Sequence, residues 1–122
     1  MVDLVLGDEE LVGSLRGWQD ESATLLAPAH FRPEVANALL RSVRLHPSDG
    51  VARIERLVRA GVDIVDRGVV GLVESVEYAS RHGLTVYDAA YLAMAVQLDG
   101  ELATRDKALA RAARQEGVEV ID

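Results

Sequence analysis

Three acidic residues of this 122-residue chain stand where the chain enters or begins an expected helix: Glu34, Asp88 and Asp106. In an open parallel sheet, ligands bind in the crevice beyond the carboxyl ends of the strands, and such helix starts lie near that crevice. The chain has no cysteine and no helical pair of histidines, so a site built from these carboxylates suits Mg²⁺ or Mn²⁺ better than zinc. The three acids therefore predict a divalent-metal site.

Each acid also has a purely structural interpretation. Asp88 fits the third position of a capping box that begins at Thr85. Asp106, below a Thr104 cap, and Glu34 each fall in an expected first helical turn, where the helix dipole favours a negative charge. For any one acid alone the structural interpretation is the better one, and only the three together favour a functional site.

The elements that must position these acids are short apolar strands separated by helices. Strands are expected at about 24–27, 62–65, 101–104 and 118–121, and helices at about 8–18, 33–45, 69–82, 85–98 and 105–116, with a further helix capped by residues 47–50 and ending at 61. Pro33 suits a first helical turn, and Gly83 after His82 suits a helix end. Such an order predicts an α/β fold with three layers, α/β/α, around a parallel central sheet.

Composition bounds the remaining possibilities. The length fits a single domain over residues 1–122, and the lack of cysteine excludes disulfides and a thiol nucleophile and fits a reducing cytoplasm. No apolar run is long enough to span a membrane, and no glycine-rich loop indicates a nucleotide cofactor. The net charge of −7 does not attract nucleic acid, so RNA binding would depend on local arginines and bound cations.

Three segments carry a resemblance to a known family. They read RPEVANAL at 32–39, HGLTVYDAAYLA at 82–93 and LATRD at 102–106. Together, in this order, they resemble the PIN-domain family and its VapC-type toxins. The resemblance extends from about residue 8 to residue 121, and the middle segment is its most specific part.

The resemblance implies a metal-dependent endoribonuclease toxin of a VapBC-type toxin–antitoxin pair, which cleaves single-stranded RNA with Mg²⁺ (or Mn²⁺). Glu34, Asp88 and Asp106 become catalytic acids that hold the metal, and Thr104 becomes a catalytic residue that orients a carboxylate or a water. The metal would activate a water for in-line attack. A VapB-type antitoxin, an RNA substrate and a second copy of the chain in a homodimer are the implied partners.

Further along the helix that begins near Glu34, Asn37, Arg41 and Arg44 lie on one expected face. This face is interpreted either as a basic stripe that leads RNA toward the metal or as an ordinary solvated surface, and the solvated surface is favoured. The histidines share no spacing typical of metal ligands. His82 is expected to end a helix, and His30 and His46 to lie in loops.

The beginning of the chain departs from the family, whose central first strand ends in Val-Asp-x-Ser/Thr and supplies the first metal-binding acid. Residues 1–7 are expected to form the helix that follows this strand, so that the domain lacks its first strand. The alternative is that Val2–Leu6 is the strand and Asp3 the first acid.

Two other functions are considered beside the ribonuclease. A catalytically incomplete PIN-like module that binds an antitoxin or RNA would explain a missing first acid. A phosphoacceptor receiver domain also has this size and an Mg²⁺ site, but its late lysine should lie at a strand end, and Lys107 lies past the expected strand. The second of these is disfavoured.

Overall fold

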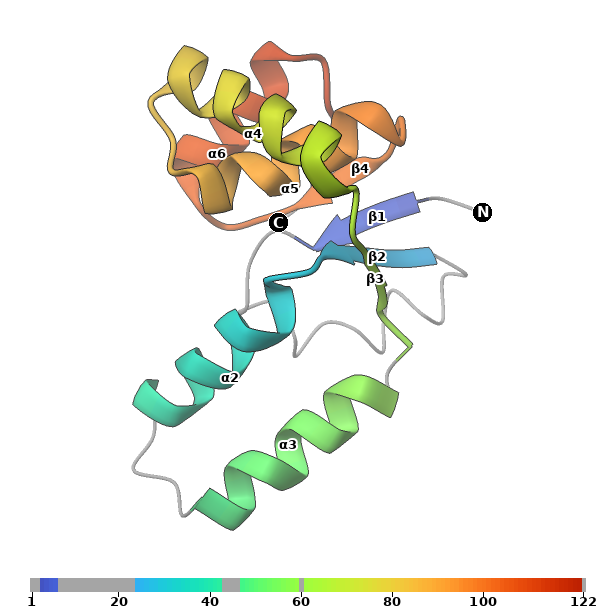
Figure 1. Ribbon diagram of the computed structural model, residues 1–122, viewed down its shortest axis with the longest axis vertical. Coiled ribbons are helices and arrows are strands. Elements are labelled where there is room, and N and C mark those ends of the chain that lie inside the picture. Colours follow the sequence, from blue (N-terminus) through green and yellow to red (C-terminus); the bar gives the residue numbers. More distant parts are fainter. Residues whose placement is uncertain (1–2, 7–23, 43–46, 60, 122) are drawn as a thin grey trace.

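The computed structural model describes residues 3–6, 24–42, 47–59 and 61–121 (Figure 1). In chain order the elements are β1 (Asp3–Leu6), β2 (Thr24–Pro28), α2 (Phe31–Ser42), α3 (Pro47–Arg59), β3 (Asp63–Val65), α4 (Gly68–His82), α5 (Val86–Gln97), β4 (Glu101–Ala103), α6 (Lys107–Gln115) and β5 (Val120–Ile121). Among these residues no helix has both the length and the apolar character that crossing a membrane requires.

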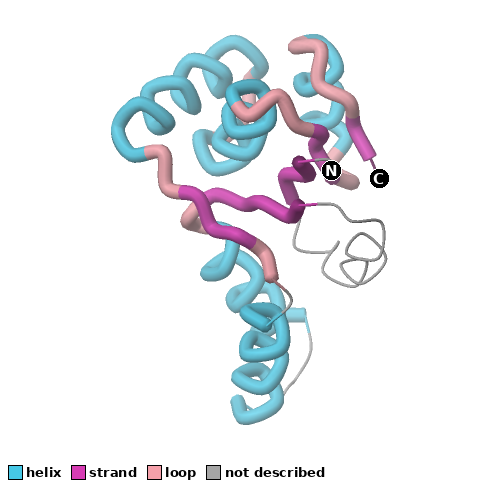
Figure 2. The backbone as a smooth tube through the Cα atoms, turned by 90° about the vertical axis from the view of Figure 1, so that its right-hand side faces the viewer, coloured by secondary structure: helices cyan, strands magenta, loops and turns pink. Residues whose placement is uncertain are grey.

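The strands form one parallel sheet in the order β3-β2-β1-β4-β5. The chain builds the sheet outward from β1 in one direction and then returns to build the other half. Because parallel crossovers are right-handed, reversing the direction moves the connecting helices to the opposite face. Figures 1 and 2 show this division, with α4, α5 and α6 on one side of the sheet and α2 and α3 on the other. The predicted α/β/α arrangement around a parallel sheet is confirmed.

Helix α5 forms the centre of the core. It contacts β1, β2 and β4 on one side and α4 and α6 on others. Its sequence is apolar on almost every side, as is typical of a helix that other elements surround. Tyr91 and Leu92 are almost completely buried and belong to the same core cluster as Val5 of β1 and Leu102 of β4. Burial of side chains of this size contributes about 1.5–3 kcal/mol each.

The structure corrects the prediction for the first residues. Asp3–Leu6 is not part of a helix but the central strand, hydrogen-bonded to β2 and β4. Val5 and Leu6 are 0% and 1% exposed, as expected of a strand covered on both faces. A strand of four residues, three of them apolar, is too short for periodicity to distinguish it from a helix, so the sequence pattern alone could not identify it.

The alternative for this segment is half right. It is a strand, but the backbone of Asp3 pairs with Thr24, the first residue of β2. Asp3 therefore lies at the amino edge of the sheet, whereas Leu6 pairs with Ala103 at the carboxyl edge. The structure does not support Asp3 as the first acid of a site at the carboxyl edge.

The remaining boundaries agree with the sequence to within a few residues. Pro47–Gly50 is itself the first turn of α3 rather than a cap before it. The end of α4 is as predicted: His82 is its last residue, and Gly83 follows with φ of 67°, a left-handed conformation that glycine adopts without strain. The helix predicted at 8–18 and residue His46 lie outside the described residues.

Candidate functional site

The turn after β2 positions the first acid. β2 ends at Pro28, and α2 begins at Phe31, whose buried side chain anchors the helix in the core. Glu34 lies in the first turn of α2, and its Oε1 atom is 3.1 Å from Nε2 of His30, four residues earlier. The first acid of the predicted site is thus tied to a histidine at the carboxyl end of β2.

The start of α5 positions the second acid. Thr85 is the N-cap, and its hydroxyl oxygen accepts a hydrogen bond from the backbone N–H of Asp88 at 3.1 Å. The bond expected from a capping box is therefore present, and it fixes Asp88 in the first turn of α5. One residue earlier, the carbonyl oxygen of Tyr87 lies 3.0 Å from the same Nε2 atom of His30.

His30 joins these two helix starts. Its Nε2 faces a carbonyl oxygen and a carboxylate oxygen, which both only accept hydrogen bonds, so Nε2 carries the proton. The ring also lies edge-on to Tyr87 and Tyr91, with centroid distances of 5.5 and 4.9 Å. Burial lowers the pKa of His30 below 6.5, against the opposing effects of the Tyr87 carbonyl and the Asp88 charge, so the ring is neutral at neutral pH.

Sequence reasoning placed His30 in a loop and gave it no role. Its loop position is confirmed, because it lies in the turn between β2 and α2. Its contacts depend on Tyr87, 57 residues away, which no local pattern reveals. The spacing of four residues from Glu34 was the one signal in the sequence that linked it to the site.

The end of β4 positions the third acid. Thr104 is buried, and its hydroxyl oxygen accepts a hydrogen bond from the backbone N–H of Asp106 at 3.1 Å. The Asp106 carboxylate in turn accepts from the backbone N–H of Leu109 at 2.9 Å, which makes Asp106 the N-cap of α6. The sequence suggested Thr104 as the N-cap, whereas in the structure the N-cap is Asp106. In this structure the Thr104 hydroxyl orients the Asp106 backbone.

The three acids share one edge of the sheet but do not form one ligand set. Glu34 contacts His30, and the charge of Asp88 acts on the same ring. Asp106 instead follows β4, which lies two strands away from β2 in the sheet. Strands are spaced by about 4.8 Å, so β2 and β4 lie roughly 10 Å apart. Within the described ranges, no three His, Asp or Glu side chains are arranged to hold a metal ion. These residues as placed do not fit the predicted metal site, although their oxygen atoms are the right donors.

The expected basic stripe on α2 is only partly visible. Asn37 is exposed one turn after Glu34. The side chain of Arg41 and all of Arg44 lie outside the described part of the structure. The stripe stays a prediction.

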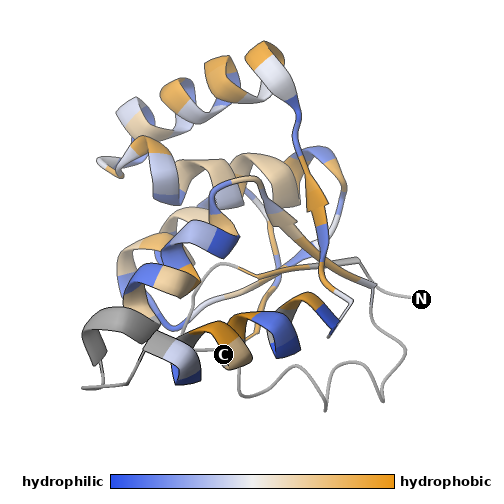
Figure 3. Cartoon of the chain, turned by 60° about the horizontal axis from the view of Figure 1, so that its bottom comes forward, coloured by the Kyte–Doolittle hydropathy of each residue, from blue (hydrophilic) through white to orange (hydrophobic). Residues whose placement is uncertain are grey.

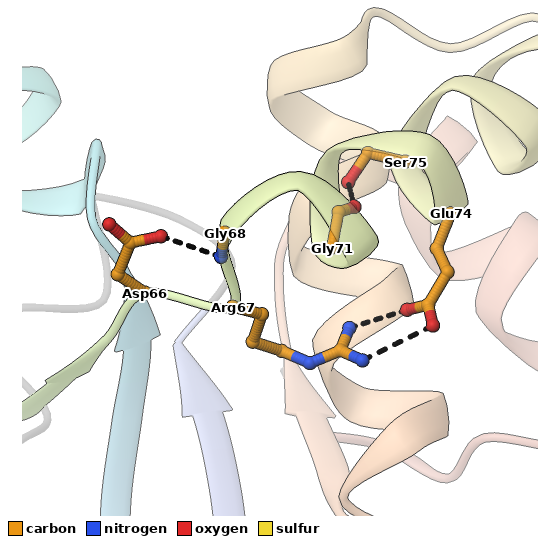
Figure 4. A network of polar contacts seen from close by, with 6 residues as sticks. All are labelled: Asp66, Arg67, Gly68, Gly71, Glu74 and Ser75. Atoms are coloured by element: carbon orange, nitrogen blue, oxygen red, sulfur yellow. Dashed lines mark hydrogen bonds and ion pairs between the residues drawn. The ribbon is translucent and has the colours of Figure 1, made fainter.

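A pocket of about 200 Å³ opens beside His30, between the starts of α4 and α5. Figure 4 shows its wall at the start of α4, where Arg67 forms an ion pair with Glu74 at 2.5 Å. The Asp66 carboxylate accepts from the N–H of Gly68 at 2.8 Å, which fixes the turn between β3 and α4. Gly71 packs so closely that an added Cβ would lie 2.7 Å from Cβ of Arg67. The start of α4 is therefore a tightly packed wall of the pocket beside His30.

Comparisons with known proteins show the family and the fold of this chain. The model of the PIN domain family matches residues 1–115. Ribonuclease VapC1 of Mycobacterium tuberculosis, in two strains, is 36% identical over 118 residues, which cover 92% of this chain and 84% of the relative.

Solved structures share the fold. PAE2754 from Pyrobaculum aerophilum has a TM-score of 0.77 at 19% identity, over 98% of this chain and 83% of that one. VapBC-1 from nontypeable Haemophilus influenzae has a TM-score of 0.66 at 12% identity, over 100% and 98%. FitAcB from Neisseria gonorrhoeae has a TM-score of 0.61 at 20% identity, over 98% and 96%. The matched sequences and the shared fold confirm the resemblance of the three motifs: this chain belongs to the PIN domain family.

Proposed function

We propose that this chain is an endoribonuclease toxin of the VapBC type, which cleaves single-stranded RNA and is neutralised by a VapB-type antitoxin. The observation that carries the proposal is the junction at His30, which contacts Glu34 of α2 and the Tyr87 carbonyl, one residue before Asp88, at the start of α5. The 36% identity to a relative named as a ribonuclease supports it.

The residues of this junction have distinct proposed tasks. Asp88 and Glu34 concentrate negative charge where a water molecule would have to lose a proton before attacking a phosphodiester. His30 is neutral and donates a hydrogen bond to Glu34, so it holds that carboxylate in place and leaves its negative charge uncompensated by a cation. Asp106, fixed by its cap on α6, is proposed as a third acid at the same edge.

We extend the proposal to a dependence on Mg²⁺ or Mn²⁺, which the family resemblance implies. Because the described acids do not form a ligand set, no step of the reaction is derived through the metal. Metal binding is tested by a measurement that is independent of activity. A ligand that binds only the folded chain stabilises it by about 2.7 kcal/mol at 100 times its Kd. A melting temperature that rises with millimolar Mn²⁺ supports a site, and one that does not change contradicts it.

The function itself is tested by cleavage of a labelled single-stranded RNA with added Mg²⁺, with and without EDTA. Asp88→Asn and Glu34→Gln should each reduce the cleavage rate by about 100-fold or more, as expected for a residue that takes part in proton transfer in the transition state. Asp49→Asn is the matched control, because Asp49 is also an acid in the first turn of a helix but lies on α3. Equal rates for Asp88→Asn and Asp49→Asn would contradict the proposal.

A second candidate function is a PIN-like interaction module without catalytic activity. It is favoured by the exposed apolar surface of α4, which we call the α4 apolar face and which consists of Val69, Val70, Leu72, Val73 and Val76. In Figure 3 the outer side of α4, the uppermost helix, carries this hydrophobic colour. Contiguous apolar surface of this kind usually marks a protein interface. Binding of an antitoxin without any RNA cleavage would favour this second function.

A further inference from the structure

Helix α6 presents a basic face to solvent. Lys107, Arg111 and Arg114 lie at positions i, i+4 and i+7, on one side of the helix, and all three are exposed. The opposite side is buried in the core through Leu109, Ala110, Ala112 and Ala113. Packing of the apolar side therefore fixes the direction in which the three cations point.

These cations line a groove of about 600 Å³, which we call the α6 groove. Thr104, Arg105, Gln115 and Val120 complete its wall together with Ala110. Thr104 directly follows β4, and Asp106 caps the helix at the same end. One end of the groove thus lies at the carboxyl edge of the sheet, where the candidate acids are.

The charge of this segment is opposite to that of the rest of the chain. Residues 105–115 contain four basic residues and one acid and so carry +3, whereas the whole chain carries −7, which leaves −10 for the remainder. Lys107, Arg111 and Arg114 form no ion pair with an acid of the described ranges. Lys107 also lies in the first turn of α6, where the helix dipole disfavours a cation. Helix stability alone does not explain this distribution.

We propose that the α6 groove binds the phosphate backbone of the RNA substrate and leads it to the carboxyl edge of the sheet. This inference rests on the proposed ribonuclease function. Phosphates are bound through their neutralisation by Lys and Arg, and a surface of charge −10 elsewhere repels an RNA strand. Arginine binds phosphate with two parallel hydrogen bonds, which suits Arg111 and Arg114.

An acidic peptide is the competing occupant for a basic groove. RNA is favoured because the groove ends beside Thr104 and Asp106, at the edge that a substrate must reach. A peptide partner has no such need to approach this edge. The α6 groove is also distinct from the expected stripe on α2, which begins at Asn37.

The test uses two matched double variants of the full chain. Arg111→Gln/Arg114→Gln removes two groove cations, and Arg56→Gln/Arg59→Gln removes two exposed arginines of the same spacing from α3. Binding of a fluorescein-labelled 20-nucleotide single-stranded RNA is measured by anisotropy in EDTA over a range of salt concentrations. Intactness of the RNA is checked on a denaturing gel.

For single strands, log K falls against log salt with a slope of about −0.7 for each phosphate neutralised. The groove variant should therefore show a slope shallower by about 1.4 and a weaker affinity at low salt. The α3 variant should retain the slope of the unmodified chain. Equal slopes for the two double variants overturn the inference, as does groove-dependent binding of a 20-residue glutamate peptide that is tighter than that of the RNA.

Failure of this inference is distinguishable from failure of the proposed function. If the unmodified chain binds RNA through the groove but cleaves none, the groove assignment stands and the ribonuclease proposal fails. If it cleaves RNA and both double variants bind and cleave alike, the ribonuclease proposal stands and the groove assignment fails. Adding Lys107→Gln to the groove variant should make the slope of log K against log salt shallower by about a further 0.7.

Discussion

The Nε2 atom of His30 lies 3.1 Å from the Oε1 atom of Glu34, one helical turn further along the chain. The same nitrogen donates to the carbonyl oxygen of Tyr87, so one neutral ring connects the start of α2 to the start of α5. The geometry of the candidate site therefore depends on a residue that is not itself an acid.

Replacing this ring should destabilise the fold. His30→Ala removes the donor from two oxygens and the edge contacts with Tyr87 and Tyr91, and it should lower the free energy of unfolding by about 1–2 kcal/mol. His30→Gln keeps an N–H donor and should lower it less. Urea unfolding of both variants measures the difference, and a His30→Ala variant as stable as the unmodified chain would count against the role assigned to the ring.

Glu116 should make stability depend on pH in the acid range. Hydrogen bonds from Arg81 at 2.8 Å and from His82 at 2.7 Å hold the pKa of its carboxyl below the usual 4.5. Because the folded pKa is the lower one, this stabilisation is present above pH 4.5 and is lost as the pH falls through the folded value. Glu116→Gln should therefore have a lower melting temperature than the unmodified chain at pH 7.

The control for this prediction is the same comparison at a pH below the folded pKa of Glu116. There the carboxyl of the unmodified chain is protonated, and the two melting temperatures should converge. A difference of equal size at both pH values would show that packing and not ionisation is responsible.

Glu101 should have the opposite dependence. Burial, followed by the neighbouring Glu119, raises the pKa of the Glu101 carboxyl above 4.5. A raised pKa gives stability that is present at acid pH and lost as the pH rises through the folded value. Glu119→Gln removes the repulsion, and it should raise the free energy of unfolding at pH 7, with little change at pH 4. The gain should not exceed about 0.5 kcal/mol, because solvent screens charges on the protein surface. A loss of stability at pH 7 would contradict this prediction.

The α4 apolar face should be covered by a second copy of the chain, because the family resemblance implies a homodimer. Val69→Gln/Val73→Gln should shift the molar mass, measured by light scattering, from dimer toward monomer. Val51→Gln/Val58→Gln changes two exposed valines of α3 and should leave the mass unchanged. A monomeric unmodified chain would refute the dimer and leave an antitoxin as the partner to test on the same face.

How far the sequence predicts this fold depends on local signals. From β3 onward the elements have caps or glycine ends, such as Thr85 and Gly83, and their boundaries were predicted to within a few residues. β1 is only four residues long, and its identity is determined by the two strands that pair with it. The helix predicted there was therefore wrong.

The candidate site follows the same rule. Glu34, Asp88 and Asp106 could be selected from sequence because each lies in or beside the first turn of a helix. The separation of Asp106 from the other two acids could not be predicted, since it depends on the distance between β2 and β4 across the sheet. The groove on α6 could not be predicted either, because its wall also includes Thr104 and Val120, which lie outside the helix.

The central position of β1 determines when this protein can fold. Leu4 pairs with Glu101, so the middle of the sheet joins residues nearly a hundred positions apart. Contacts of such sequence separation form slowly, because the chain must first close a long loop. During synthesis, a chain that has not yet reached β4 leaves one edge of β1 without its partner. The sheet edge that carries the candidate acids is therefore assembled only after β4 has been made, so a growing chain on the ribosome does not present that edge before then.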